Sequence, residues 1–184
     1  MSTRGRAWTL DEYETLPDQD GLRHELVEGL VVSEPRPAFA HGAAQASIAA
    51  ALHAFVAQRG LGRVVTESGF ILARDPDTLR GPDVAFVSGE RLEGLAQLAG
   101  FFEGAPDLCV EVRSPHDREA DMRARVADYL AAGARVVWVA HPERREVTVY
   151  RTLLAPRTFA ASDVLDGEDV LPGFRIEVGE LLGD

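Results

Sequence analysis

The stretch of sequence that decides the fold is a pair of short segments, RGPDVAFV at residues 80–87 and PDLCVEVRSP at residues 106–115. Each segment sets one acidic side chain, Asp83 or Glu111, against an apolar run that is rich in valine. Valine favours β-strands, and a buried strand does not carry a carboxylate without a reason. Two carboxylates on adjacent strands can share a divalent cation, which is the minimum that a metal-assisted hydrolase requires.

The length and composition of the chain predict one domain that spans residues 1–184. Of its 184 residues, 46% are apolar, which is enough to fill a hydrophobic core. The formal net charge is −11, whereas a nucleic-acid-binding protein usually presents a basic face. This charge argues against strong non-specific binding to DNA but leaves room for a local basic groove. All 19 basic residues are arginine, which constrains any mechanism that needs a lysine.

The single cysteine, Cys109, lies inside an apolar run and cannot by itself form a disulfide framework or a zinc cluster. We expect it to be a small buried core residue. No apolar run approaches the roughly 18 residues of a membrane span, and residues 1–6 lead into no signal-type apolar stretch. The expected location is therefore the cytoplasm, with no membrane partner.

Hydrophobic periodicity and turn residues around the two segments predict a succession of helices and strands. Thr9 and Glu12 form the pattern of a capping box, which opens a short helix that ends at Leu16. Residues 24–32 are predicted to form a hairpin that turns at Glu28-Gly29. Further helices are expected at residues 41–59, 90–99 and 118–132, and strands at residues 63–68, 70–73, 84–87, 108–112, 136–140 and 146–151. The remaining predictions are a polar turn at 74–81, a loop at 100–106, and short strands that end in a brief helix at 158–182.

The middle of the chain has the order helix, strand, strand, strand, helix, strand. Strands that are separated by a helix usually pair in parallel, so we expect the strands at 108–112 and 136–140 to be parallel neighbours. The expected fold is an α/β domain with a mixed β-sheet flanked by helices, in αβββαβ order, with the N-terminal hairpin as an extension.

This order, with Pro-Asp on the second core strand and Glu-Val-Arg on the third, resembles the PD-(D/E)XK nuclease superfamily. A closer resemblance, over residues 7–182, is to the Uma-type family of restriction-endonuclease-like proteins. It is carried by RHELVEG at 23–29, His41, GPDVAFV at 81–87, APDL at 105–108, EVRSP at 111–115, YLAAG at 129–133, and VWV at 137–139 followed by Pro142-Glu143. The resemblance implies a restriction-endonuclease-like core, a Mg²⁺ or Mn²⁺ cofactor and hydrolysis of DNA phosphodiester bonds.

The resemblance assigns the two metal-binding carboxylates to Asp83 and Glu111, and the carbonyl of Val112 could supply a third oxygen ligand. A further acid is plausible at Glu25, which matches the family's glutamate before its glycine turn, or at Glu67, at the end of the first core strand. The alternatives stay open. Asp83 could cap a turn, Glu111 could pair with a nearby arginine, and Glu25 and Glu67 could be ordinary exposed strand residues.

The superfamily's lysine has no counterpart in this chain. Its usual position, two residues after the glutamate, is Arg113, and the Uma-type position on the following helix is Arg125, four residues before Tyr129. Arginine cannot act as a base, but it can bind a phosphate with two hydrogen bonds and stabilise transition-state charge. Both arginines are therefore catalytic candidates for an electrostatic role. Alternatively, Arg125 is a solvated helix residue that pairs with Asp121.

His41, at the start of a long helix, could face the phosphate, although we prefer a structural role for it. The leading functional hypothesis is a divalent-metal-dependent endonuclease that acts on DNA. One alternative is a catalytically weak or inactive nuclease fold that serves as a binding or assembly module, and another is a metal hydrolase of a different phosphoester. A basic patch of Arg113, Arg118, Arg123 and Arg125 around the carboxylates would favour the first hypothesis, and an acidic rim would favour the others. A homodimer is also expected, because duplex cleavage often uses two copies.

Overall fold

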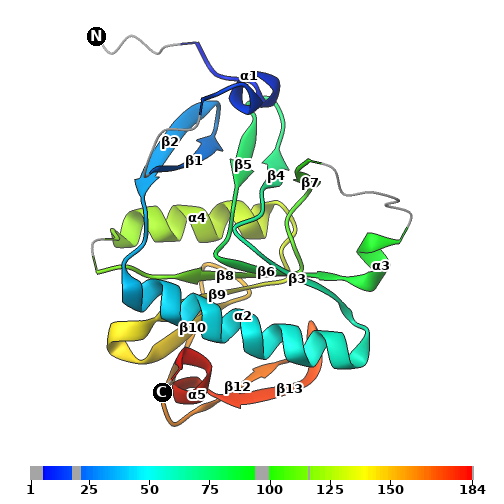
Figure 1. Cartoon of the computed structure of the whole chain (residues 1–184), viewed down its shortest axis with the longest axis vertical. Coiled ribbons are helices and arrows are strands. Elements are labelled where there is room, and N and C mark those ends of the chain that lie inside the picture. The colour runs from blue at the N-terminus through cyan, green and yellow to red at the C-terminus, as the bar shows by residue number, and fades with distance from the viewer. Residues whose placement is uncertain (1–5, 18–21, 94–99, 116, 184) are drawn as a thin grey trace.

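A six-stranded mixed sheet forms the centre of the computed structural model, which describes residues 6–17, 22–93, 100–115 and 117–183 (Figure 1). The strand order is β11-β10-β9-β8-β6-β3. The strands β8 and β9 pair in parallel, as predicted for strands separated by a helix, and the other neighbours are antiparallel. Their bounds are β3 Gly62–Thr66, β6 Val84–Ser88, β8 Leu108–Val112, β9 Val136–His141, β10 Glu146–Tyr150 and β11 Arg157–Ala160.

A second sheet of five strands, in the order β2-β1-β5-β4-β7, lies beyond helix α4 in Figure 1. The strands β1 and β2 form the predicted N-terminal hairpin, which turns at Glu28 and Gly29 with positive φ angles of 49° and 74°. Only glycine fits the second position, because a Cβ atom there would lie 2.6 Å from the Cβ of Ala7. The bounds are β1 Leu22–Val27, β2 Leu30–Pro35, β4 Phe70–Ala73, β5 Thr78–Arg80 and β7 Phe102–Glu103.

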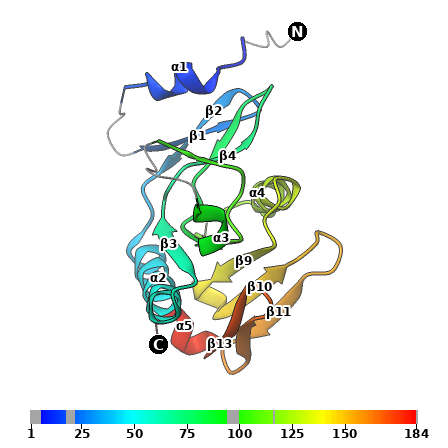
Figure 2. The ribbon, with the colours of Figure 1, turned by 90° about the vertical axis from the view of Figure 1, so that its right-hand side faces the viewer.

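Helices α2 (Phe39–Arg59) and α4 (Glu119–Ala131) pack on opposite faces of the six-stranded sheet (Figure 2). On α2, the buried apolar residues recur every four positions, which is the spacing of one helix face. These residues are Ala44, Ile48, Leu52 and Val56, and they share a core with Val110 and Trp138 of the sheet. On α4, the buried residues Met122, Val126 and Tyr129 pack against Cys109, Val137 and Val139.

Smaller elements complete the domain around the sheets. The two-stranded ribbon β12 (Val164–Gly167) and β13 (Leu171–Glu177) and helix α5 (Val178–Leu182) contribute apolar residues to the core on the α2 side. Helix α1 (Leu10–Glu14) has the predicted capping box between Thr9 and Glu12, and a 3₁₀ helix, η1 (Pro142–Arg144), connects β9 to β10. None of the helices in the described part of the chain is long and apolar enough to span a membrane.

The alternation of side chains along β8 positions the candidate site. Val110 and Val112 face α2, so Cys109 and Glu111 face the opposite side, toward α4. The prediction that Cys109 is a buried core residue is confirmed, with 0% of its surface exposed. Of the β8 side chains that face α4, Glu111 is the charged one.

Three details of the predicted secondary structure are wrong. The predicted strand pair at 63–68 and 70–73 is divided between the two sheets as β3 and β4, because Glu67 takes a left-handed φ of 50° and the chain turns away there. The predicted turn at 74–81 contains β5, whose Arg80 is buried through ion pairing, and the predicted loop at 100–106 contains the two-residue strand β7. Of the predicted helix at 90–99, the structure shows α3 (Gly89–Leu92), and residues 94–99 lie outside the described residues.

Candidate active site

Asp83 and Glu111 lie next to each other at the junction of β6 and β8. Val84 pairs with Val110 in antiparallel register, so Asp83, just before β6, lies across from Glu111. Only 3% of Asp83 and 5% of Glu111 is exposed. Both line a hollow of about 380 Å³ and also a second hollow of about 310 Å³, so the two hollows meet at the carboxylates. The sequence prediction that these two acids converge is therefore met by the geometry.

Three groups bind the Asp83 carboxylate. Its Oδ2 accepts a hydrogen bond of 2.7 Å from the backbone N–H of Val112 and lies 3.2 Å from His41 Nε2. Its Oδ1 accepts a hydrogen bond of 3.3 Å from Arg23 Nη1. Burial alone would raise the pKa of Asp83, but His41, the Val112 N–H and Arg23 together lower it below the ordinary value. Asp83 is thus a carboxylate at neutral pH.

Glu111 is held differently from Asp83. The Tyr129 hydroxyl donates a hydrogen bond of 2.6 Å to its Oε1, and Arg125 Nη1 lies 3.8 Å from the same oxygen. Burial raises the pKa of Glu111 to about 8, and the negative charges of Asp83 and Glu25 add to this effect, whereas Arg125 opposes it. The two neighbouring acids therefore differ in protonation at neutral pH, with Asp83 ionised and Glu111 mostly neutral.

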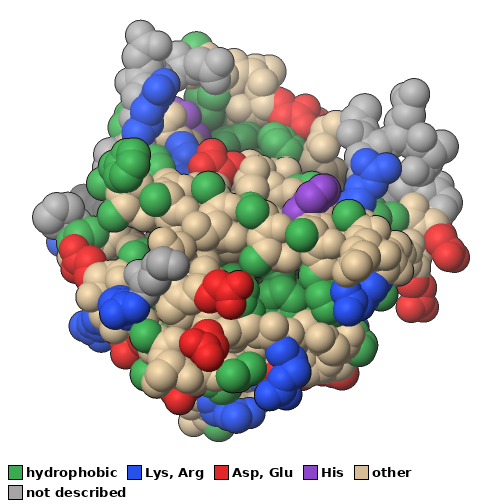
Figure 3. Space-filling view, turned by 60° about the horizontal axis from the view of Figure 1, so that its bottom comes forward, with side chains coloured by type: hydrophobic (Ala, Val, Ile, Leu, Met, Phe, Trp, Pro, Cys, Tyr) green, Lys and Arg blue, Asp and Glu red, His purple; other side chains and the backbone are tan. Residues whose placement is uncertain are grey.

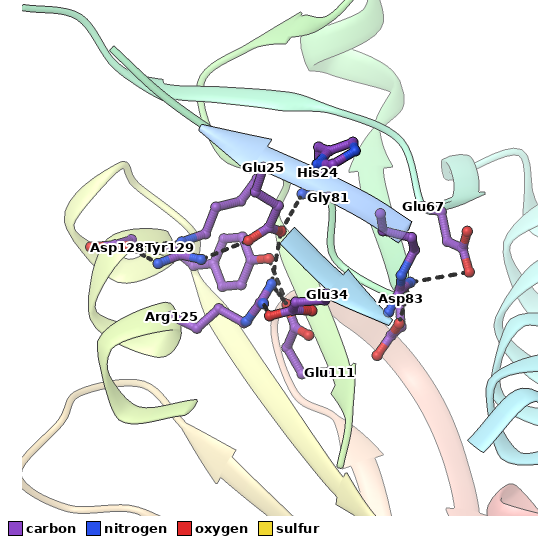
Figure 4. A network of polar contacts seen from close by, with 12 residues as sticks. His24, Glu25, Glu34, Glu67, Gly81, Asp83, Glu111, Arg125, Asp128 and Tyr129 are labelled. Carbon is purple, nitrogen blue, oxygen red and sulfur yellow. Dashed lines mark hydrogen bonds and ion pairs between the residues drawn. The ribbon is translucent and has the colours of Figure 1, made fainter. Parts of the chain in front are cut away.

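A buried network of charges supports this pair (Figure 4). Glu25 on β1 lies between two arginines, with Arg80 Nη1 2.7 Å from its Oε2 and Arg125 Nη1 2.7 Å from its Oε1. Arg80 also pairs with Asp128 of α4, and Arg125 also pairs with Glu34 of β2. The pKa of Arg125 is raised, because burial would lower it but Glu111 and Glu25 outweigh that effect. Arg125 therefore stays charged, and it pairs with Glu25 and Glu34 rather than with Asp121.

The other residues predicted for the site are more exposed than Asp83 and Glu111, lie in another hollow, or have their polar groups bound to other residues. Glu67 lines the second hollow, but its side chain is 45% exposed and its Oε1 lies 3.2 Å from Arg23 Nη1. Arg113 lines a separate hollow of about 90 Å³, where it donates hydrogen bonds to Glu119 and to the carbonyl of Asp117. Val112 lines the main hollow, and its N–H is committed to Asp83. Glu25 has both carboxylate oxygens engaged, since its Oε1 also accepts the N–H of Gly81.

The basic patch that would favour a DNA endonuclease over the alternatives does not form around the carboxylates. Of its members, Arg118 and Arg125 line the main hollow, whereas Arg113 does not, and Arg123 donates to the carbonyl of Leu153. The main hollow is lined instead by arginines and acids in nearly equal number. These are Arg23, Arg36, Arg118 and Arg125 with Glu34, Asp83, Glu111, Asp117 and Asp121. Neither a basic patch nor a purely acidic rim describes this surface.

Sequence reasoning missed two residues that contact the carboxylates, Tyr129 and Arg23, and two that belong to the surrounding charge network, Glu34 and Arg80. Tyr129 follows Arg125 by four positions, so both side chains project from one face of α4, and this spacing was a usable signal. Arg23 and Glu34 are directly paired in the β1–β2 hairpin, but nothing in the sequence shows that the hairpin lies over the site. The buried Arg80 was likewise concealed by its position in a predicted turn.

The donors at this site suit a hard divalent cation. Within residues 6–17, 22–93, 100–115 and 117–183, no three His, Cys, Asp or Glu side chains are arranged to hold a metal ion. Mg²⁺, however, commonly binds through one or two carboxylates and keeps several water ligands. The mutual repulsion of Asp83 and Glu111 contributes to the raised pKa of Glu111, and a cation between them would relieve it. The two carboxylates therefore fit such an ion.

Comparisons with known proteins agree with this fold. The family described as "Uma2: Putative restriction endonuclease" matches residues 10–179. The crystal structure of a protein from Anabaena variabilis ATCC 29413, described as "a putative nuclease belonging to DUF820", superimposes with a TM-score of 0.83. The two proteins share 22% sequence identity over 95% of this chain and 97% of the other, a likeness that shows the fold. No curated protein matches the chain. Because the family match extends over most of its length, this chain belongs to the Uma2 family of nuclease-like proteins.

Proposed function

We propose that this protein is a divalent-metal-dependent endonuclease that hydrolyses DNA phosphodiester bonds. The observation that carries the proposal is the pair of nearly inaccessible carboxylates, Asp83 and Glu111, which adjacent strands bring together at the base of a hollow. A buried carboxylate pair is costly unless a cation or a proton compensates it. Membership of the family described as "Uma2: Putative restriction endonuclease" supports the proposal that this pair holds a catalytic metal.

In this proposal Asp83, Glu111 and the Val112 carbonyl hold Mg²⁺ or Mn²⁺. When bound, such an ion neutralises charge on the phosphate and lowers the pKa of an attacking water. His41 and Tyr129 fix the two carboxylates by the contacts described above. Arg125 stabilises negative charge near Glu111, but it cannot accept a proton, so it replaces only the electrostatic half of the role of a lysine.

A second candidate is a nuclease fold that binds its partner without cleaving it. The observation that favours this candidate is that the arginine at the lysine position, Arg125, is committed to Glu25 and Glu34 in the absence of substrate. Phosphate would have to compete with these carboxylates for the guanidinium group. Such a protein would retain the metal site and lack turnover.

Titration calorimetry with Mn²⁺ and Mg²⁺, combined with a plasmid-nicking assay on the same preparation, separates the two candidates. The proposal predicts metal binding, nicking in the presence of either ion, and complete loss of nicking when EDTA removes the metal. Metal binding without nicking would support the binding module instead. The absence of metal binding would contradict both candidates, because each of them has a metal site.

The raised pKa of Glu111 predicts that metal affinity increases with pH. Because this pKa is about 8 in the metal-free protein, Glu111 must lose a proton before it can bind the ion at any lower pH. The affinity for Mg²⁺ should therefore rise by up to about tenfold per pH unit below pH 8 and level off above it. Calorimetry in two buffers of different ionisation enthalpy should show release of up to one proton below that pH. A pH-independent affinity in this range would contradict the assignment of Glu111 as a ligand.

A further inference from the structure

The main hollow is lined by four arginines that differ in their availability. Arg23 is paired with Asp83 and Glu67, and Arg125 is paired with Glu25 and Glu34. Arg36 and Arg118 are both exposed, and the side chain of neither makes an ion pair or a hydrogen bond with any residue that the structure describes. The hollow therefore offers two charged groups with free donors beside the buried carboxylates.

The backbone presents these two arginines from different walls of the hollow. Arg36 lies in the connection from β2 to α2, directly before Pro37, which restricts its backbone to an extended conformation. Arg118 is the N-cap residue of α4, with an extended φ of −78° and ψ of 139°, and its side chain makes no capping hydrogen bond. Both connections run along the left-hand side of the molecule in Figure 1. Asp83 and Glu111 line the same hollow.

The chemistry of these groups selects an anion with several phosphates. A free guanidinium group donates two parallel hydrogen bonds to a phosphate, and it does so better than any other side chain. The chain as a whole has a net charge of −11. On the face shown in Figure 3, the coloured acidic and basic side chains are scattered and form no broad basic area. A polyanion that binds this chain would therefore have to be held by individual arginines, because the overall charge repels it.

The size of the hollow favours one strand over two. Its volume of about 380 Å³ lies in the range of about 300–1,000 Å³ that small ligands occupy. A double helix, which is wide enough to admit an α-helix into its major groove, is too thick to enter such a space, and the carboxylates that line it are only 3% and 5% exposed. One unpaired strand can follow a narrow charged groove.

We propose that Arg36 and Arg118 bind the phosphates of a single unpaired nucleic-acid strand and place its backbone over Asp83 and Glu111. This inference rests on the proposed function, because it names the substrate class of the same site. The acidic side chains of the hollow limit the affinity. Of these, Glu34 is paired with Arg125, and Asp117 accepts the backbone N–H of Ser114. Binding should therefore be moderate in strength and strongly dependent on salt.

Fluorescence anisotropy in EDTA tests this inference without any need for cleavage. The probes are a fluorescein-labelled single-stranded oligonucleotide of about 12 nucleotides, within the usual site size, and the duplex of the same sequence. The variants are Arg36→Ala/Arg118→Ala and a matched control, Arg63→Ala/Arg175→Ala. The control removes two exposed arginines that line neither hollow. Both double variants remove the same charge, so only the position of the charge differs.

The wild type is expected to bind the single strand at least tenfold more tightly than the duplex. Arg36→Ala/Arg118→Ala should weaken binding by tenfold or more and reduce the slope of log K against log salt concentration by about 1.4, the value for two contacts to a single strand. The control should keep the wild-type slope. Equal losses in the two double variants, a preference for the duplex, or no binding by the wild type would each overturn the inference. Single-strand binding that persists in a protein unable to nick DNA would contradict the proposed hydrolysis and leave this binding site intact.

Discussion

Conversion of either Asp83 to asparagine or Glu111 to glutamine is expected to reduce the rate of DNA nicking by at least about 100-fold, and to abolish metal binding at the same time. Each substitution keeps the size of the side chain but removes the negative charge that the cation requires. Asp83→Asn also retains an oxygen that can accept the N–H of Val112, so the local backbone contact can persist. The loss should therefore fall on the metal and the reaction rather than on folding.

Calorimetry, nicking rates and thermal unfolding of the same samples measure these three effects separately. Glu143→Gln is a suitable control, because Glu143 is an exposed acid of η1 that lines only the small separate hollow. This variant should nick DNA at a rate within about twofold of the wild type.

Glu67→Gln tests whether Glu67 is an additional metal ligand, as the sequence suggested. A large loss of metal affinity in that variant would require Glu67 to leave Arg23 and join the site. If Glu111→Gln bound metal and nicked DNA like the wild type, the proposed site would be wrong.

The two carboxylates could be predicted from the sequence, because each is an isolated charge in or directly before an apolar strand. Their convergence also followed from the strand order, since β6 and β8 are neighbours in the sheet. The parallel pairing of β8 with β9 was predictable from the helix between them. These features depend on local patterns and on general rules of chain connection.

The second sheet and the charge network could not be predicted in the same way. The strands β5 and β7 have three and two residues, too few for a periodic pattern, and β5 contains a buried arginine. Glu25 and Arg125 are 100 positions apart, and Glu25 and Arg80 are 55 apart. No spacing rule connects residues at such separations. Whether the arginines on and near α4 form one patch was likewise left open by the sequence, and their side chains lie in different surroundings.

Glu25→Ala is expected to destabilise the protein by about 3–5 kcal/mol, the usual cost of removing one partner from a buried ion pair. The side chain of Glu25 is 11% exposed, and those of Arg80 and Arg125 are 7% and 10% exposed. Loss of the carboxylate leaves two guanidinium groups facing each other in a poorly hydrated space, and it also removes the acceptor of the Gly81 N–H. The β1 strand would then lose its side-chain ion pairs with β5 and α4.

Urea unfolding of Glu25→Ala beside Glu34→Ala provides the measurement and its control. Glu34 also pairs with Arg125, but its side chain is 41% exposed, so its removal should cost at most about 1 kcal/mol. A loss of 3–5 kcal/mol corresponds to a fall in melting temperature of roughly 6–20 °C for a domain of this size. Glu25→Gln should fall between the two variants, because the amide keeps one acceptor oxygen but no charge. Equal and small losses in Glu25→Ala and Glu34→Ala would show that water reaches the two arginines, and that Glu25 does not connect the hairpin to the site through a buried charge.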